Sequence, residues 1–202
     1  MTDPDPRHDG EHHAPSWARD GDGAHDTDVA SNWLFRLRRE RFRSRRSGRT
    51  HDYFVLHLAD AVHAVAVTPD DRLVMVRQFR AGSARDSLEP PGGLLDPGED
   101  AAEAGARELL EETGYAGDPP VSLGAIWSLP SLVTSRTHTV VITNARPVAP
   151  PKLDPTEEVG VELVPVAEVP ALIRDGRIDH ALAVSALLLW LARRPGGVAL
   201  AP

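Results

Sequence analysis

The segment from Gly93 to Tyr115 constrains the fold and chemistry of this chain more than any other part of the sequence. Within it, Glu108, Glu111 and Glu112 stand at offsets of zero, three and four, so a helix places their carboxylates on one face within a single turn. Three like charges in that arrangement destabilise an isolated helix by about 0.2–0.5 kcal/mol per pair. A divalent cation would remove this penalty, because Mg²⁺ binds carboxylate oxygens and keeps coordination positions for substrate phosphates. The spacing therefore predicts a metal–phosphate site.

The residues around these glutamates predict where the helix begins, ends and packs. The sequence 96–98, Asp-Pro-Gly, has the composition of a turn, and Glu99 and Asp100 suit the first helical turn, where the helix dipole favours negative charge. Gly114 suits the left-handed residue that follows a helix end. A stripe of small and apolar side chains is expected to pack on a sheet. It consists of Ala102, Ala106, Leu109 and Thr113.

Arg107 stands between Glu103 and Glu111 in an i, i+4 ladder. We expect it to hold a carboxylate in its metal-binding rotamer through a bidentate pair. The structural alternative for the segment is a solvated acidic helix with surface ion pairs. Seven specified positions in one loop–helix context favour the metal site instead. They are Gly93, Glu99, Arg107, Glu108, Glu111, Glu112 and Gly114.

Length and composition indicate a single folded domain. The chain has 202 residues, 41% of them hydrophobic, and no cysteine, which excludes disulfides, thiolate catalysis and cysteine-based zinc sites. The first thirty residues contain no apolar leader segment, and the longest apolar run, residues 181–192, is too short to cross a bilayer. These features predict a cytoplasmic protein without a membrane segment.

The formal charge of −8 is concentrated at the N-terminus. Residues 1–30 carry eight acidic side chains against two arginines, and Trp17 is their only large apolar side chain. Such a composition buries too little apolar surface to fold, so we predict a disordered acidic tail over residues 1–30 and a folded domain over residues 31–202. The tail's histidines are irregularly spaced, which favours a solvated segment over a metal site. They are His8, His12, His13 and His25.

Residues 33–49 contain eight arginines and one glutamate. A basic run with interleaved aromatic residues is compatible with a nucleic-acid surface. However, Phe35 and Leu37 alternate with arginines at strand period, and residues 53–56 form a second apolar strand. We therefore predict a β-hairpin with a basic outer face and argue against nucleic acid as a partner.

The rest of the chain alternates between predicted strands and helices. Strands are expected at residues 61–67, 72–79, 121–127, 137–143 and 159–166. Two helices are expected to close the chain, the first at about 166–175 and the second at about 179–193. Asp179 is predicted as the N-cap of the second helix.

The seven fixed positions resemble the signature of the Nudix hydrolases, G-x5-E-x7-R-E-U-x-E-E-x-G-U, in which U is a bulky apolar residue. Leu109 and Tyr115 occupy the two U positions, and Tyr115 departs from an aliphatic residue. The resemblance implies an α/β Nudix fold, an α/β/α sandwich around a mixed β-sheet, here with an N-terminal β-hairpin. It also implies Mg²⁺-dependent cleavage, with Mn²⁺ as a substitute, of a diphosphate linked to a second group.

Features outside this segment resemble the ADP-ribose and nucleoside-diphosphate-sugar pyrophosphatase branch of the family. The run 76–80, Val-Arg-Gln-Phe-Arg, and the run 89–93, Glu-Pro-Pro-Gly-Gly, match motifs of that branch, and Pro130 lies 15 residues beyond Tyr115. The loop after Pro130 departs from the branch, because Ser131 replaces a glycine and Ser135 stands in place of a glutamate. ADP-ribose or a related nucleotide sugar is therefore the expected substrate.

The resemblance assigns roles residue by residue. The expected metal ligands are Glu89, Glu108, Glu111 and Glu112. The expected substrate-binding residues are Arg77, Arg80, Gly92, Gly93 and Glu99. Arg107 and Glu108 belong to the catalytic set. The Gly92-Gly93 pair also permits close backbone approach without a Cβ, and Phe79 or Trp127 is expected either to stack on a base or, more simply, to lie in the core.

A general base must reach the attacking water from a loop that folds over the metal face. The loop 145–158 offers three candidates, Asp154, Glu157 and Glu158, of which we predict Glu157, with Glu158 next. Resemblance to the branch also predicts a homodimer. The alternatives are a Nudix hydrolase of dNTPs, NADH or dinucleoside polyphosphates, a catalytically inactive nucleotide-binding module and an RNA-associated protein.

Overall fold

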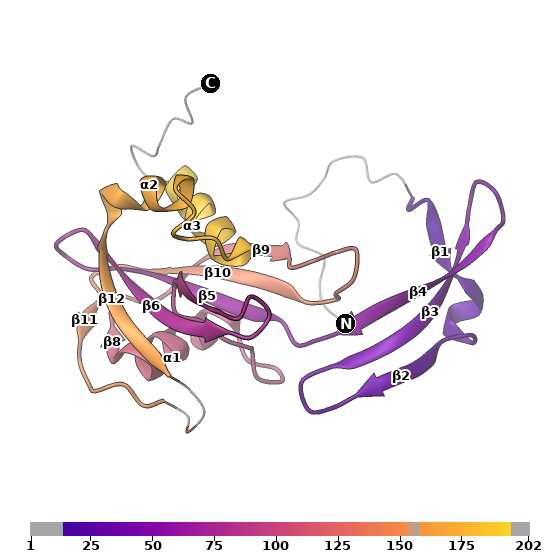
Figure 1. Cartoon of the computed structure of the whole chain (residues 1–202), viewed down its shortest axis with the longest axis horizontal. Helices are drawn as coiled ribbons and strands as arrows, with labels where there is room; N and C mark the ends of the chain where they lie inside the picture. The colour runs from indigo at the N-terminus through magenta and orange to yellow at the C-terminus, as the bar shows by residue number, and fades with distance from the viewer. Residues whose placement is uncertain (1–13, 154, 156–157, 195–202) are drawn as a thin grey trace. The chain divides into compact units, whose positions relative to one another are not determined.

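The computed structural model describes residues 14–153, 155 and 158–194, and it divides into two compact units (Figure 1). The N-terminal unit covers Met1–His57 and the C-terminal unit covers Leu58–Pro202. The division therefore falls after the predicted hairpin, whereas the sequence-based boundary was placed at residue 31. Each unit has its own sheet.

The N-terminal unit is a four-stranded antiparallel sheet. Its central strand, β3 (Arg36–Ser44), pairs with β4 (Thr50–His57) in a register that runs from Arg36 opposite His57 to Arg43 opposite Thr50. This pairing confirms the predicted hairpin. The other edge of β3 is shared by β1 (Trp17–Arg19) and β2 (Thr27–Ser31). Residues 20–23 form a short 3-10 helix, η1 (Asp20–Gly23).

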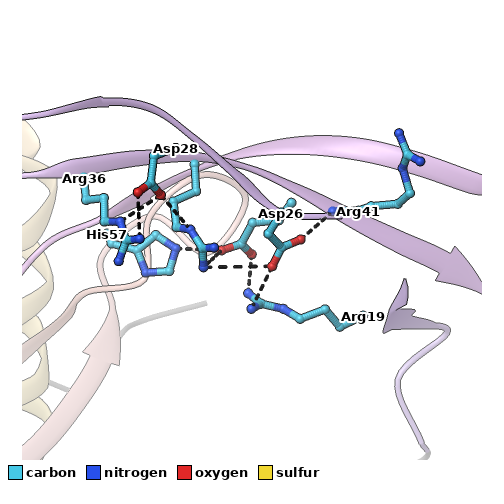
Figure 2. Close-up of polar contacts among 8 residues, drawn as sticks. Arg19, Asp26, Asp28, Arg36, Arg41 and His57 are labelled. Atoms are coloured by element: carbon cyan, nitrogen blue, oxygen red, sulfur yellow. Dashed lines mark hydrogen bonds and ion pairs between the residues drawn. The ribbon is translucent and has the colours of Figure 1, made fainter. Parts of the chain in front are cut away.

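The sheet corrects the predicted tail, because residues 14–30 were expected to be disordered and instead contain β1, η1 and β2. Residues 1–13 lie outside the described part of the chain. The physical reason is charge pairing. Asp28 of β2 accepts hydrogen bonds from Arg36 and from Arg38, and the buried Asp26 lies 3.1 Å from Arg19 (Figure 2). Asp20, Asp26 and Asp28 of the predicted tail thus face arginines of β3.

The same pairing bears on the nucleic-acid alternative. Glu40, which is 2% exposed, accepts a hydrogen bond from Arg19 and lies 2.7 Å from His57 Nε2. Arg41 binds Asp52, and Arg43 binds Asp20. Arginines that already face carboxylates offer less positive charge to a phosphate backbone. Arg36, Arg38, Arg41 and Arg43 of the hairpin all face carboxylates in this way.

The C-terminal unit contains a mixed sheet in the order β12-β6-β5-β10-β9, with β7 alongside β6. Pairing is parallel between β5 and β10 and antiparallel elsewhere in this sheet. The strands are β5 (Ala61–Val67), β6 (Arg72–Arg80), β7 (Arg85–Glu89), β9 (Val121–Trp127), β10 (Arg136–Ile142) and β12 (Val159–Pro165). A small separate pair joins β8 (Tyr115–Ala116) to β11 (Arg146–Pro147).

Helices cover both faces of this sheet (Figure 1). Helix α1 (Ala101–Thr113) packs on one face, and α2 (Val169–Arg174) and α3 (Ala181–Arg193) pack on the other. Successive residues of β6 alternate between the two cores: Leu73 and Met75 pack with α3, and Val74 packs with α1. The predicted α/β/α sandwich around a mixed sheet is confirmed.

The strands β5 and β6 separate after a short stretch of pairing. They pair only at Ala66 with Val74 and at Val67 with Leu73, and β6 then pairs with β7. Beyond β7, the segment 90–93 takes the place beside β5: the amide of Val62 bonds the Gly93 carbonyl, and the amide of Ala64 bonds the Pro91 carbonyl. This split in the sheet places Glu89 and the glycine pair between two strands.

The end of the chain differs in detail from the prediction. A 3-10 turn, η2 (Val166–Glu168), precedes α2, and α3 begins after His180, so Asp179 is not its N-cap. The Asp179 carboxylate instead accepts a hydrogen bond of 2.9 Å from Arg85. Among the described residues, the helices are too short or too polar to cross a membrane.

Candidate metal-dependent active site

Local contacts fix both ends of α1. The Asp100 carboxylate caps the N-terminus by accepting a 2.8 Å hydrogen bond from the amide of Ala102, and the amide of Glu99 closes the preceding turn onto Asp96. Gly114 ends the helix with a φ of 72°, a conformation that glycine adopts without steric cost. The helix and its end at Gly114 agree with the sequence prediction, whereas Glu99 and Asp100, expected in the first turn, precede the helix, which begins at Ala101. Its buried side chains include Leu109 and Thr113 of the predicted stripe.

We call Glu108, Glu111 and Glu112 the α1 carboxylate cluster. Their side chains range from buried to half-exposed: Glu112 is 5% exposed, the side chain of Glu108 is 14% exposed and that of Glu111 is 44% exposed. Glu112 accepts a 2.9 Å hydrogen bond from the amide of Gly92. A Cβ at Gly93 would lie 2.4 Å from Glu108 Oε1, so a larger residue there would force this carboxylate to move.

Arg107 organises the carboxylates around it. Its Nε and Nη2 bind the two oxygens of Glu99 at 2.8 and 2.9 Å, and its Nη1 lies 2.9 Å from Glu108 and 3.1 Å from Glu111. The hydrogen bonds from Arg107, assisted by the amide of Asp96, lower the pKa of the Glu99 carboxyl to about 2. The same hydrogen bonds raise the pKa of the Arg107 guanidinium above its usual value. The predicted bidentate pair exists, and its partner is Glu99.

The donor chemistry of the α1 carboxylate cluster fits a hard divalent cation. Two of its three carboxylates, Glu108 and Glu111, bind the same arginine, Arg107. Carboxylate oxygens are the ligands that Mg²⁺ and Mn²⁺ prefer. Glu108, Glu111 and Glu112 are therefore the residues that would hold such an ion.

Glu89 has different neighbours from those that the sequence predicts. It was expected to join the α1 carboxylate cluster, but it lies fully buried at the end of β7, where Arg80 Nε donates a 2.7 Å hydrogen bond to its Oε1. Its other oxygen lies 2.9 Å from His180 Nδ1. Burial opposes ionisation of Glu89, but the contacts with His180 and Arg80 outweigh it and lower its pKa to about 2. The role of Glu89 as a ligand of the Mg²⁺ site therefore stays a prediction, and its observed partners are Arg80 and His180.

The surroundings of Glu89 include a cavity of about 280 Å³. Arg80, His180 and His63 line it, together with the Gly92-Gly93 pair that contacts the α1 carboxylate cluster. Burial lowers the pKa of His63 to about 4, so its ring is neutral at physiological pH. The cavity therefore joins the glycine pair to a group of histidines that the sequence reading did not single out. A histidine inside the Ala/Val strand 61–67 was the available signal.

The remaining predicted substrate residues lie on β6 and β9. Arg77 pairs with Glu162 of β12, and Arg80 pairs with Glu89, so both guanidiniums are held by carboxylates. Phe79 and Trp127 are 59% and 57% exposed, so the core position favoured for them is wrong. Arg136 lies over the Trp127 ring at 5.7 Å. Exposed rings on this unit agree with the alternative that one of them stacks on a base.

The loop that carries the predicted base is anchored to α1. The amide of Lys152 donates a 2.7 Å hydrogen bond to the Glu111 carbonyl, and the amide of Val148 donates to Gly114. The loop therefore passes the C-terminal end of the helix that bears the carboxylates. Glu158 is described and exposed, whereas Asp154 and Glu157 lie outside the described residues.

An α/β/α sandwich that presents an acidic helix beside a glycine pair defines a hydrolase of the Nudix class. The NUDIX domain model matches residues 57–187, which is more than half of the chain, and this chain therefore belongs to the Nudix family. The predicted family is confirmed.

Several known proteins are similar to this chain. ADP compounds hydrolase NudE of Escherichia coli (strain K12) is 34% identical over 135 residues, which cover 63% of this chain and 71% of that protein. ADP-ribose pyrophosphatase of Bacillus subtilis (strain 168) is 33% identical over 112 residues, covering 55% of this chain and 60% of that protein. A crystal structure of an ADP compounds hydrolase matches with a TM-score of 0.72 and 28% identity over 83% of this chain and 91% of that one.

Proposed function

We propose that this enzyme hydrolyses the diphosphate linkage of ADP-ribose or a related nucleotide sugar and releases two monophosphate products. The observation that carries the proposal is the α1 carboxylate cluster held by Arg107 beside the Gly92-Gly93 pair. The family and the names of the similar proteins support a pyrophosphohydrolase that acts on nucleoside diphosphate derivatives.

Mg²⁺, or Mn²⁺ in its place, is the proposed cofactor. When bound, it would neutralise charge on the diphosphate and lower the pKa of a water. Glu108, Glu111 and Glu112 would hold it. Arg107 orients two of these carboxylates, and the hydrogen bond from Gly92 to Glu112 ties the third to the glycine pair. The protein's contribution at this end of the site is thus a fixed set of oxygen donors.

Other residues are proposed to bind substrate and to move the proton. Arg80 faces the cavity beside the glycine pair, where a guanidinium suits a phosphate oxygen. An exposed ring, Phe79 or Trp127, is available to stack on a base. Glu157, with Glu158 as the alternative, would accept the proton of the attacking water, because its loop is tied to the end of α1.

A substrate screen tests the proposal. Purified full-length protein is incubated with Mg²⁺ and ADP-ribose, other nucleotide sugars, NADH, dinucleoside polyphosphates or dNTPs, and products are separated by chromatography. We expect two monophosphates from ADP-ribose and loss of turnover in EDTA. Faster turnover of NADH or a dNTP would replace the substrate assignment. Binding of nucleotides without turnover of any of them would favour a catalytically inactive module.

Two further predictions concern assembly and location. The N-terminal unit is proposed to mediate a homodimer in which hairpin arginines approach the other subunit's substrate. Light scattering should then give twice the mass of 21.9 kDa at micromolar concentration, and a monomer mass would exclude this arrangement. The cytoplasmic location rests on the composition of the chain, and cell fractionation would test it.

A further inference from the structure

A second group of potential metal ligands lies at the split between β5 and β6. His63 comes from β5, Glu89 from the end of β7 and His180 from the residue before α3. Their ligand atoms all lie within 4.8 Å of one another. Among the described residues, no other group of three histidine or acidic side chains brings its ligand atoms this close together. We call these three residues the histidine cluster.

One atom each of His63 and Glu89 is held by a hydrogen bond to a neighbouring group outside the histidine cluster. His63 Nδ1 lies 3.1 Å from the Pro90 carbonyl, which selects the tautomer that leaves Nε2 as an acceptor. Glu89 Oε1 is bound by Arg80 Nε at 2.7 Å. Metal-binding histidines and carboxylates typically have their second atom held in this way by a carbonyl or a charged neighbour.

The atoms of Glu89 and His180 that face each other make no hydrogen bond of regular geometry. Glu89 Oε2 and His180 Nδ1 are both buried and both lack a hydrogen-bond partner, although they lie 2.9 Å apart. Their contact is close but not aligned as a hydrogen bond. A fully buried carboxylate is costly unless its charge is balanced, so a Glu89 that lies against two imidazoles requires a reason. A cation between the three side chains supplies one.

We propose that the histidine cluster binds a divalent cation of the kind that prefers imidazole, with Zn²⁺ as the representative ion. Two imidazoles and one carboxylate match the protein ligands of an open zinc site, whereas an all-carboxylate set suits Mg²⁺. The site is chemically distinct from the α1 carboxylate cluster. It would connect the start of α3 to the split sheet.

The position of the cavity indicates where the remaining coordination position points. His63 and His180 line the cavity of about 280 Å³ together with Arg80 and the glycine pair. A metal with three protein ligands keeps a fourth position for water or another ligand. Here that position would face the cavity and Arg80. A bound cation would therefore lie near the candidate active site without using its carboxylates.

The competing explanation is a plain structural ion pair between protonated His180 and Glu89, with Arg80 as a second cation. This explanation accounts for the buried charge of Glu89, but it gives His63 no role in balancing that charge. The two explanations differ in the role of His63. Only the metal site requires both histidines and predicts binding of a cation.

Titration with Co²⁺ tests the proposal, because four-coordinate Co²⁺ replaces Zn²⁺ and absorbs visible light strongly. The full chain is used with three tail histidines replaced, His8→Asn, His12→Asn and His13→Asn, so that they cannot bind the ion. We expect one strongly absorbing Co²⁺ per chain, displacement of this Co²⁺ by Zn²⁺ and a higher unfolding temperature with Zn²⁺ than with EDTA.

Variants of the ligands then localise the ion. In that background, His180→Asn, His63→Asn and Glu89→Gln should each weaken Co²⁺ binding by at least about tenfold and remove its strong absorption. His51→Asn is the matched control, because His51 is an exposed histidine of the N-terminal unit. Unchanged Co²⁺ binding in His180→Asn and Glu89→Gln overturns the proposal. Because His180 is partly exposed, its variant should fold even if His63→Asn does not.

A final variant separates this inference from the proposed function. Glu112→Gln should lose Mg²⁺-dependent hydrolysis and keep Co²⁺ binding with its strong absorption. Loss of the absorption in Glu112→Gln would assign the ion to the α1 carboxylate cluster and refute the second site. A protein that binds Co²⁺ at the histidine cluster but hydrolyses no nucleotide would refute the proposed function alone.

Discussion

Two arginine–carboxylate networks in this molecule differ in their ratio of arginines to carboxylates. On β3 and its neighbours, arginines and carboxylates are nearly equal in number, and each carboxylate of the network faces at least one arginine. On α1, Arg107 binds Glu99, Glu108 and Glu111, and Glu112 accepts a hydrogen bond from the amide of Gly92. A matched network stabilises a sheet. A network with excess negative charge is one that a cation completes.

The comparison also separates structural from chemical uses of the same residue types. In the N-terminal unit, the pairs between Asp28 and its arginines are exposed and connect neighbouring strands (Figure 2). Around α1, Arg107 binds several carboxylates, and the Gly92-Gly93 pair lies against them. A Cβ at Gly93 would push the Glu108 carboxylate out of place. Excess charge in a fixed geometry, more than the number of charges, therefore indicates a reactive site.

The largest expected effect is on Glu112 itself. Glu112→Gln keeps the acceptor for the Gly92 amide but removes the charge that would bind the cation, so kcat should fall by at least about 100-fold with little change in unfolding temperature. Glu103→Gln, on the exposed side of α1, is the matched control and should keep activity. Near-normal turnover of Glu112→Gln at saturating Mg²⁺ would break the distinction between the two networks.

The next effect is on Arg107. Arg107→Lys keeps one positive charge but cannot bridge Glu99, Glu108 and Glu111 together, so we expect kcat to fall by about 10–100-fold and the Mg²⁺ requirement to rise. Kinetics over a range of Mg²⁺ concentrations measures both. The control is Asp28→Asn in the matched network, which should leave hydrolysis unchanged. Equal losses in both variants would mean that α1 has no special role.

Removal of β1 and β2 should have a smaller effect, confined to stability. Deleting residues 1–31 removes the strands that pair with one edge of β3 and leaves its arginines without their acidic partners. We expect the first unfolding transition in calorimetry to fall by at least about 4 °C. Deleting residues 1–13 is the matched control, because it leaves both strands intact. An unchanged transition in the longer deletion would mean that β1 and β2 contribute nothing to stability, as expected for the disordered tail that the sequence predicts.

The contrast between the two units explains what could be predicted from sequence. Helix α1 was predicted together with its C-terminal end, because its final glycine, its stripe and its glutamates lie within one local segment. The strands β1 and β2 were missed, because acidic residues of the predicted tail pair with arginines further along the chain, as Asp28 does with Arg36. Local periodicity reports helices well, but it does not report which charged segments neutralise each other.

The candidate site divides in the same way. The α1 carboxylate cluster was predicted from spacing, whereas the histidine cluster joins residues from β5, β7 and the start of α3 that no local pattern connects. Glu89 was predicted from its motif without its neighbours, Arg80 and His180. Asp179 has the right residue type for an N-cap, but Arg85 binds its carboxylate. In each case the missing information was tertiary contact.

The smallest expected effect is the pH dependence of the Glu99–Arg107 pair. The folded-state pKa of Glu99 is lowered from 4.5 to about 2, so its contribution to the free energy of unfolding is present above pH 4.5 and is lost as the pH falls toward 2. Because the pair is only partly shielded from solvent, we expect about 1 kcal/mol. Urea unfolding at several pH values between 2 and 5 should therefore show a steeper loss of stability for the natural chain than for Glu99→Gln.

Asp28→Asn is the comparison in the matched network, where the pKa of Asp28 is also lowered by its hydrogen bond to Arg36 but the side chain is exposed. Its pH profile should differ less from that of the natural chain, because solvent screens an exposed pair more than a partly buried one. If the two variants flatten the profile equally, then the Arg107 network is held no more tightly than an ordinary surface ion pair, and its proposed role in orienting the α1 carboxylate cluster would lose its physical basis.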